Sequence, residues 1–250
     1  MAYPQDTKEI IKRYTDFLKN KKVVVVGPAF HMKGWRQGKV IDSYDVIVRL
    51  SKGYEIDEKY KSRDIKEYTN GKYVFNKDIK LDFGSRTDIL YQTMLPNWGN
   101  GTQSPINELK DDIKWICASF PDKRHRQCII DFIKYNNNRI PMHIMDKKYW
   151  EKIRDDMRTI PSVGASAILD LLQYDIKEIY ITGFNFYLAK DENGFFYYPD
   201  YFYGDKKHLK DNRPKGKHNH FKIFKYLKKL YERDKRIKCD KTLIDLMEKY

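Results

Sequence analysis

The stretch KKVVVVGPAFHMKGWRQGKVIDSYDVIVRLS, residues 21–51, decides the fold of this chain. Four consecutive valines stop at Gly27, and a second apolar run ends at Arg49. A short apolar run that ends at glycine is typical of a buried parallel strand leading into a ligand-binding loop. Because ligands of open α/β sheets lie at the carboxyl ends of the strands, we expect the binding site beside Gly27.

Strand-like and helix-like patterns alternate along the rest of the chain. They predict strands at 21–27, 44–50, 88–91, 114–119 and 178–182. They predict helices at 7–20, 34–42, 123–136, 147–157, 161–172, 218–233 and 241–249, with Phe221, Phe224, Leu227 and Leu230 on one face of the helix at 218–233. The alternation favours a mostly parallel, Rossmann-type sheet flanked by helices, in a single domain of residues 1–250.

Two long segments, 54–80 and 186–217, are polar, irregular and rich in tyrosine. Segments of this length inside a compact domain tend to be lids or binding loops. We therefore predict that both form active-site loops.

The chain has 250 residues and a net charge of +14. This charge favours an anionic partner, such as nucleic acid, a membrane surface or an acidic small molecule, although a solvated lysine-rich surface explains it equally well. No apolar run approaches the roughly 20 residues that span a bilayer, and the charged N-terminus has no signal-peptide core. We expect a cytoplasmic protein, of viral or bacterial origin, whose three cysteines are reduced.

Three segments are candidates for chemistry. The Gly27-Pro28 loop lets a ligand approach the backbone, but its spacing is not that of a dinucleotide fingerprint. The small residues 161–166 begin a helix whose N-terminus suits a phosphate or carboxylate, and close packing against the sheet explains them equally well. His218 and His220 are candidate acids or bases, or structural residues.

Paired carboxylates of the Asp-x-Asp type are absent from the sequence, as are P-loop, HExxH, GxSxG and CxxC patterns. Enzymes that bind a sugar diphosphate through a divalent cation need such carboxylates to hold the metal. We therefore expect neither a metal nor another cofactor.

The segment at 21–51 resembles the large sialylmotif of the vertebrate-type sialyltransferases, which use CMP-sialic acid. That motif runs from a strand through Val-Gly-Asn-Ser to Ile-Asp-x-Tyr/His-Asp-Val-Val-x-Arg-Met-Asn. It is matched here by Gly27, Gly34, Gly38, Ile41-Asp42, Tyr44-Asp45-Val46 and Arg49. The following Gly84-Ser85-Arg86-Thr87-Asp88 resembles the family segment Gly-x-Lys/Arg-Thr-Asp.

Later segments resemble the remaining motifs in the same order, so that the resemblance covers about residues 21 to 235. The small motif, Pro-Ser-Thr-Gly before a strand ending in Tyr-Gly-Phe, resembles 161–164 and the strand ending at 182–184. His218, with Leu227 and Leu230 after it, resembles the very small motif, whose histidine is the family's catalytic base. The tyrosines of 197–203 stand where the family has a short aromatic motif.

The resemblance implies a GT-A-like glycosyltransferase that moves sialic acid, or a related acidic sugar, from a CMP-activated donor to a hydroxyl of a glycan or glycolipid. Transfer would invert the anomeric centre without a metal, with His218 as general base and His220 as the alternative. The implied donor-binding residues are Gly27, Pro28, Ala29, Arg49, Ser51, Ser162, Val163, Gly164, Thr182, Gly183, Phe184, Tyr201 and Tyr203. The positive charge would also suit peripheral contact with an anionic membrane.

The chain departs from the family pattern at three donor-contacting positions. Pro28 and Ser51 replace asparagine, and Val163 replaces threonine. These changes keep open a second interpretation, a CMP-sugar-binding protein without catalysis. A third, nucleic-acid binding by the basic and aromatic surface, gives no role to the glycine-terminated strands, so we expect no nucleic-acid partner.

Overall fold

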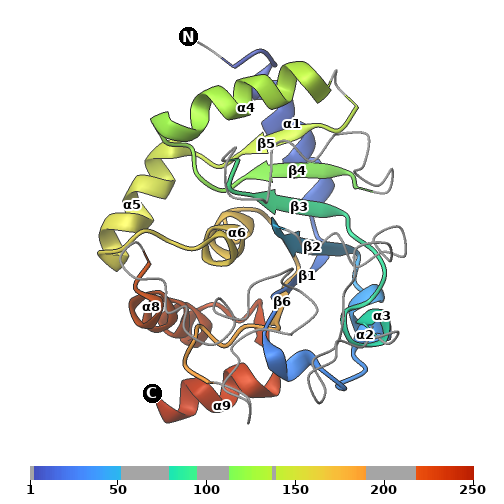
Figure 1. Cartoon of the computed structure of the whole chain (residues 1–250), viewed down its shortest axis with the longest axis vertical. Coiled ribbons are helices and arrows are strands. Elements are labelled where there is room, and N and C mark those ends of the chain that lie inside the picture. Colours follow the sequence, from blue (N-terminus) through green and yellow to red (C-terminus); the bar gives the residue numbers. More distant parts are fainter. Residues whose placement is uncertain (1–2, 52–78, 95–112, 137–138, 190–217) are drawn as a thin grey trace, which may run out of the picture.

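The computed structural model describes residues 3–51, 79–94, 113–136, 139–189 and 218–250. Within these residues the centre of the molecule is a sheet of seven parallel strands in the order β5-β4-β3-β2-β1-β6-β7 (Figure 1). The strands are β1 (Lys22–Val26), β2 (Val46–Leu50), β3 (Ile89–Gln92), β4 (Trp115–Ala118), β5 (Met142–Ile144), β6 (Glu178–Thr182) and β7 (Ile237–Cys239).

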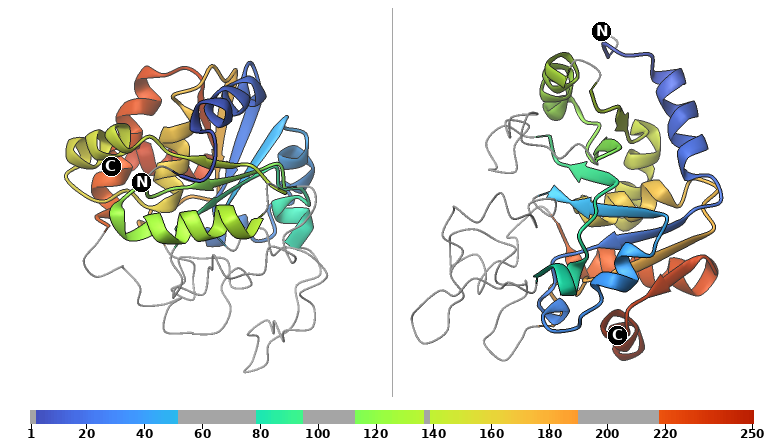
Figure 2. Two further views of the ribbon diagram at one scale, coloured as in Figure 1. Left: turned by 90° about the horizontal axis from the view of Figure 1, so that it is seen from above. Right: turned by 90° about the vertical axis from the view of Figure 1, so that its right-hand side faces the viewer.

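Helices cover both faces of this sheet, as the views in Figures 1 and 2 show. One face packs against α1 (Thr7–Leu18), α5 (Lys147–Met157), α6 (Val163–Leu171), α8 (His220–Arg233) and α9 (Lys241–Lys249). The other packs against the 3₁₀ turn η1 (Phe30–Met32), α2 (Gly38–Asp42), α3 (Ile79–Phe83) and α4 (Lys123–Asn136). None of the described helices is long and apolar enough to cross a membrane.

The valines of β1 explain why the strand reads as one unbroken apolar run. Val23 and Val25 point into the core beneath α1 and α6, whereas Val24 and Val26 point into the core beneath η1 and α2. All four side chains are at most 1% exposed. A strand buried on both faces needs apolar residues at every position, which is the pattern of central parallel strands.

The direction of chain winding reverses at β1. From β1 the chain moves outward through β2, β3, β4 and β5, and it then returns to place β6 on the opposite side of β1. In open parallel sheets such a reversal leaves a crevice at the carboxyl ends of the two central strands, where ligands bind. The switch point here lies between Gly27, after β1, and Gly183, after β6.

The predicted α/β architecture with a parallel sheet is confirmed, and four elements, β6, α4, α5 and α9, have the predicted bounds. The helix predicted at 34–42 begins only at Gly38. Gly34 and Arg36 have positive φ angles, and the Asp82 carboxylate accepts hydrogen bonds from both of their amides at 2.9 Å. These bonds hold the segment in a turn that cannot continue a helix.

The predicted apolar face of α8 was wrong at one position. Phe221 is 38% exposed, and the buried residues of the helix are Ile223, Phe224 and Leu227. The predictions also missed α3, β5 and β7, which have only five, three and three residues. The predicted loops at 54–80 and 186–217 lie outside the described residues, apart from 79–80 in α3 and 186–189 after β6.

Candidate functional site

The two loops at the switch point touch through their backbones. The Gly27 amide donates to the Thr182 carbonyl and the Ala29 amide to the Gly183 carbonyl, each at 2.8 Å. A Cβ on Gly27 would lie 2.3 Å from the Gly183 oxygen, and a Cβ on Gly183 would lie 2.2 Å from the Gly27 oxygen. Both positions therefore need glycine because the loops pack on each other, a reason that the sequence did not suggest.

The start of α6 lies against the same loops. A Cβ on Gly164 would lie 2.5 Å from Cε1 of Phe184 and 3.1 Å from Cδ1 of Leu50, the last residue of β2. The Ser162 hydroxyl caps the helix by accepting from the Ala165 amide at 3.3 Å. The first amides of a helix have no acceptor within the helix, so this N-terminus brings an anion-binding group to the switch point.

The carboxyl ends of β3 and β4 add polar groups that sequence reasoning missed. Gln92 donates through Nε2 to the Ser51 carbonyl at 2.9 Å, and the Ser119 amide donates to the Gln92 carbonyl at 3.0 Å. Gln92 Oε1, Ser119 Oγ and, one turn into α6, Ser166 Oγ are buried and have no partner within the described part of the chain. Buried polar atoms are normally hydrogen-bonded, which makes these three candidates for contact with a bound polar molecule. The only signal in the sequence was the position of Gln92 directly after the strand predicted at 88–91 and of Ser119 at the end of the strand predicted at 114–119.

Arg49 is buried and binds the segment at 83–87, next to the candidate site. Its side chain is buried, its Nε donates to the Arg86 carbonyl at 3.0 Å and to Thr87 Oγ1 at 3.1 Å, and its Nη2 donates to the Phe83 carbonyl at 2.8 Å. The Asp42 carboxylate accepts from the Ser85 amide at 2.9 Å. Arg49 and Asp42, which match the large sialylmotif, therefore hold the loop between α3 and β3. The predicted donor contact of Arg49 stays a prediction.

Asp240 joins the switch point to the C-terminal helix. Its Oδ2 accepts from Thr182 Oγ1 at 3.0 Å, from the Gly183 amide at 2.8 Å and from His31 Nε2 at 3.1 Å. Its Oδ1 caps α9 through the Leu243 amide at 2.8 Å. The Thr182 hydroxyl is thus bonded within the protein, and the predicted donor contact of Thr182 stays a prediction. Neither Asp240 nor His31 was a candidate from the sequence. A carboxylate directly before a helix, such as Asp240, is usually only a helix cap.

His218 is fixed beside the start of α6. Its Nδ1 donates to the Ile160 carbonyl at 2.8 Å, two residues before Ser162. Because a carbonyl only accepts hydrogen bonds, Nδ1 carries the proton, and the lone pair of the neutral ring lies on Nε2. The next residue, Asn219, caps α8 and donates its amide to Thr159 Oγ1 at 2.8 Å. Two contacts with the 159–160 segment therefore hold this histidine in the tautomer that a base using Nε2 requires.

His220 has a different environment. Burial, together with the charge of His218, lowers its pKa to about 4. Its ring lies 4.2 Å from the ring of Tyr187, and its Nε2 is buried without a partner in the described residues. A group with this pKa is a weak base near neutral pH, which favours a packing role for His220.

We expect His220 to make the protein less stable in mild acid. Its pKa is about 4 in the folded chain and 6.5 in the unfolded chain, so the unfolded state binds the extra proton first as pH falls. The free energy of unfolding should be unaffected by this group above pH 6.5 and should fall by at most about 3 kcal/mol towards pH 4. Urea unfolding at pH 7 and pH 4.5 should show a smaller loss for His220→Phe than for the unchanged chain. An equal loss in both proteins would contradict this assignment.

The remaining predicted donor residues fall into three groups. Pro28, Ser51, Ser162 and Val163 are partly exposed near the carboxyl ends of the central strands, whereas Ala29 and Phe184 are buried. Tyr201 and Tyr203 lie outside the described residues. Among the described residues, no group of three or more His, Cys, Asp or Glu side chains is placed to hold a metal ion.

Solved structures share this fold, although no protein-family model and no curated protein matches the chain. A mammalian sialyltransferase, crystallised with Gal-beta-1-3GalNAc-ortho-nitrophenol, has a TM-score of 0.54 at 12% identity over 96% of this chain and 81% of its own. The monofunctional alpha-2,3-sialyltransferase Cst-I of Campylobacter jejuni has a TM-score of 0.51 at 15% identity over 88% and 75%. The sialyltransferase CstII of the same organism, crystallised with CMP, has a TM-score of 0.50 at 16% identity over 88% and 80%. The chain has a sialyltransferase-like α/β fold.

Proposed function

We propose that this protein is an inverting glycosyltransferase that transfers sialic acid, or a related acidic sugar, from a CMP-activated donor to a glycan hydroxyl. A series of contacts on a sialyltransferase-like fold carries the proposal: His218 is bonded to Ile160 beside the start of α6, and the start of α6 and the Gly27 loop both pack on residues 183–184. The comparison proteins are named sialyltransferases, and CstII was crystallised with CMP. We further infer that residues 1–250 act as one glycosyltransferase domain, with the segments 54–80 and 186–217 as its active-site loops.

In this mechanism His218 is the general base. Its Nε2 lone pair takes the proton from the acceptor hydroxyl while the oxygen attacks the anomeric carbon of the donor. The bond from that carbon to the phosphate oxygen breaks, and the electron pair leaves with CMP. The anomeric carbon passes through a transition state that resembles an oxocarbenium ion.

The charge that develops on the CMP phosphate needs stabilisation by groups of the protein. The N-terminus of α6 offers amides of Val163 and Gly164 and the positive end of the helix dipole. We propose that these amides, with Ser162 and the tyrosines at 201 and 203, take the place of a metal ion. Ser51 and Gln92 are joined by a hydrogen bond at the carboxyl ends of β2 and β3, and this position suits them to contact the nucleotide.

Binding of CMP should therefore be independent of divalent cations. We expect calorimetry to give the same dissociation constant for CMP, on the order of 1–100 μM, with and without EDTA. UMP is the matched control, because it differs from CMP only in its base. We expect UMP to bind more weakly than CMP. Loss of CMP binding in EDTA would contradict the metal-free mechanism.

The same titrations separate the competing functions. Binding of CMP-sialic acid followed by release of CMP in the presence of a glycan acceptor supports the transferase. Binding without turnover over a panel of acceptors would favour the catalytically inactive CMP-sugar-binding protein. Absence of binding by every cytidine nucleotide would overturn both assignments.

A further inference from the structure

Asp240 makes more hydrogen bonds than a helix cap requires. Its Oδ1 caps α9 by accepting from the Leu243 amide at 2.8 Å. Its Oδ2 accepts three further hydrogen bonds, from Thr182 Oγ1 at 3.0 Å, from the Gly183 amide at 2.8 Å and from His31 Nε2 at 3.1 Å. The Asp240 side chain is 0% exposed. A buried carboxylate is costly unless donors surround it in this way, so these bonds fix the chain around it.

Two other capping aspartates show what this role needs by itself. Asp6 caps α1 through two backbone amides, and Asp146 caps α5 through the Tyr149 amide. Both aspartates are exposed. Capping therefore explains the Oδ1 contact of Asp240, but it explains neither the burial of its side chain nor the three donors on its Oδ2.

The three donors on Oδ2 come from both loops of the switch point. His31 belongs to η1, within the loop that begins at Gly27, and the other two donors stand at the end of β6. Because the carboxylate accepts, His31 Nε2 carries the proton. Asp240 is itself tied to β6, since its amide donates to the Ile181 carbonyl at 3.0 Å. The contact between His31 and Asp240 is therefore a clamp that joins the Gly27 loop to the end of β6.

We propose that His31 and Asp240 are positioning residues of the donor site, which hold the Gly27 loop in the conformation that binds CMP. The choice of CMP as the ligand rests on the proposed function. Without the clamp, the loop keeps only its backbone contacts with the end of β6 and samples conformations in which it lies away from that strand. The apparent dissociation constant then rises by the inverse of the fraction of molecules that remain competent to bind.

His31→Phe breaks the clamp, and His31→Gln rebuilds it. Phenylalanine keeps a ring against Trp35, whose ring centroid lies 5.1 Å from that of His31, but it has no donor for Asp240. The glutamine side chain ends in an N–H donor near the position of the imidazole Nε2. Recovery in His31→Gln therefore separates the hydrogen bond from the size and packing of the side chain.

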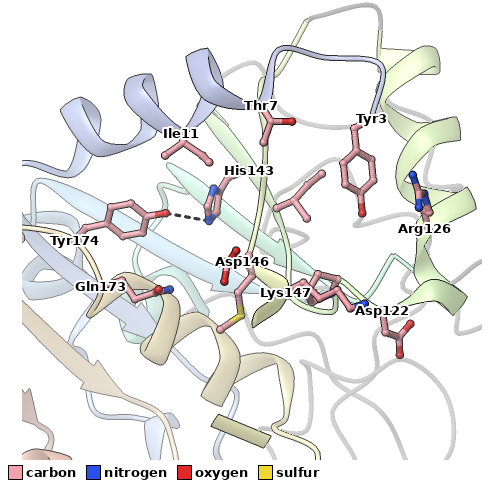
Figure 3. Close-up of a pocket in the computed structure, with 13 residues that line it drawn as sticks. Tyr3, Thr7, Ile11, Asp122, Arg126, His143, Asp146, Lys147, Gln173 and Tyr174 are labelled. Atoms are coloured by element: carbon pink, nitrogen blue, oxygen red, sulfur yellow. Dashed lines mark hydrogen bonds between the residues drawn. The ribbon is translucent and has the colours of Figure 1, made fainter. Parts of the chain in front are cut away.

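His143→Phe is the matched control, because it breaks a second buried contact between a histidine and an aspartate. His143 Nε2 lies 2.8 Å from Oδ2 of Asp170, and the two side chains are 3% and 0% exposed, against 6% and 0% in the clamp. His143 lies on β5, in the wall of the cavity that Figure 3 shows, and β5 is the fourth strand from β1. Asp170 lies in the last turn of α6, at the opposite end of the helix from the Ser162 cap.

Amide hydrogen exchange and CMP affinity are the two quantities to measure. Loss of one hydrogen bond to a charged group shifts an equilibrium by about 10- to 100-fold. The loop amides, followed by NMR at Gly27, Ala29 and Gly183, should therefore exchange about 10- to 100-fold faster in His31→Phe. Calorimetry of the same variant should give a dissociation constant for CMP about fivefold higher. His31→Gln should return both quantities to within about threefold of the unchanged chain, and His143→Phe should change neither by more than about twofold.

Asp240→Asn tests the clamp from its other side, and it replaces His31→Phe if that variant does not fold. Asparagine is as good a helix cap as aspartate. Its side chain has a single acceptor oxygen, however, so it cannot serve both α9 and the switch-point loops. The loop amides should exchange faster in Asp240→Asn, whereas Asp146→Asn, at the exposed cap of α5, should leave them unchanged.

Each outcome decides one part of the proposal. Unchanged exchange in His31→Phe and Asp240→Asn, equal acceleration in His143→Phe, or no recovery in His31→Gln would overturn the clamp. Faster exchange with unchanged CMP affinity would overturn the positioning role. If the unchanged chain does not bind CMP, the proposed function fails together with that role, and hydrogen exchange still decides whether the clamp exists.

Discussion

His218→Asn should lower the proposed sialyl transfer by about 10²- to 10⁴-fold while leaving CMP binding intact. An asparagine amide at this position can still donate to the Ile160 carbonyl, the contact that His218 Nδ1 makes at 2.8 Å. The substitution removes the Nε2 lone pair, and loss of a general base lowers kcat by about 10²- to 10⁴-fold. Steady-state transfer from CMP-sialic acid and calorimetry of CMP give the two quantities. The dissociation constant of CMP should change less than about twofold, because the proposed base contacts the acceptor.

His220→Phe is the matched control for this experiment. It replaces an imidazole whose pKa is about 4 with a ring that can keep the contact to Tyr187. We expect kcat to stay within about threefold of the unchanged chain. If His220→Phe loses as much activity as His218→Asn, or if His218→Asn stays active, the proposed base is wrong.

The fold was predictable because its signals are local and strong. The valines of β1 are buried on both faces of the sheet, so they form a short unbroken apolar run that ends at glycine and is recognisable in a single sequence. The Ser162 cap and the small residues after it likewise predict the start of α6. The strands β5 and β7, with three residues each, carry too little sequence to show a period.

The candidate site was predictable only in part, because its polar residues are defined by tertiary contacts. Arg49 matches a family motif, yet its guanidinium binds the 83–87 segment, which lies far along the chain. Asp240 looks like an ordinary helix cap in the sequence, and only the fold brings it to Thr182 and His31. Gln92 is the last residue of a strand and belongs to no motif. Its place beside Ser51 follows from the parallel pairing of β2 with β3, which puts their carboxyl ends together.

We expect Gly183→Ala to destabilise the protein severely, because Gly183 packs directly against the Gly27 loop at the switch point. Gly183 has a φ of +74°, where a side chain costs about 1–2 kcal/mol. Its Cβ would also lie 2.2 Å from the Gly27 carbonyl oxygen, a backbone atom that cannot rotate away. Forcing the loops apart adds about 1–3 kcal/mol, as overpacking of a core does. We therefore expect a total loss of about 2–5 kcal/mol in urea unfolding.

Gly34→Ala separates the two causes, because Gly34 has nearly the same φ, +77°, and a Cβ added there would meet no atom within 4 Å. It should lose only the conformational part, about 1–2 kcal/mol. The two variants should also differ in CMP affinity, since only Gly183→Ala displaces the Gly27 loop. Equal losses of stability would show that the loops separate freely, and the switch point would then be a flexible crevice in which neither glycine is needed for packing. A larger loss for Gly183→Ala with weakened CMP binding ties the rigid contact between β1 and β6 to the binding of the nucleotide.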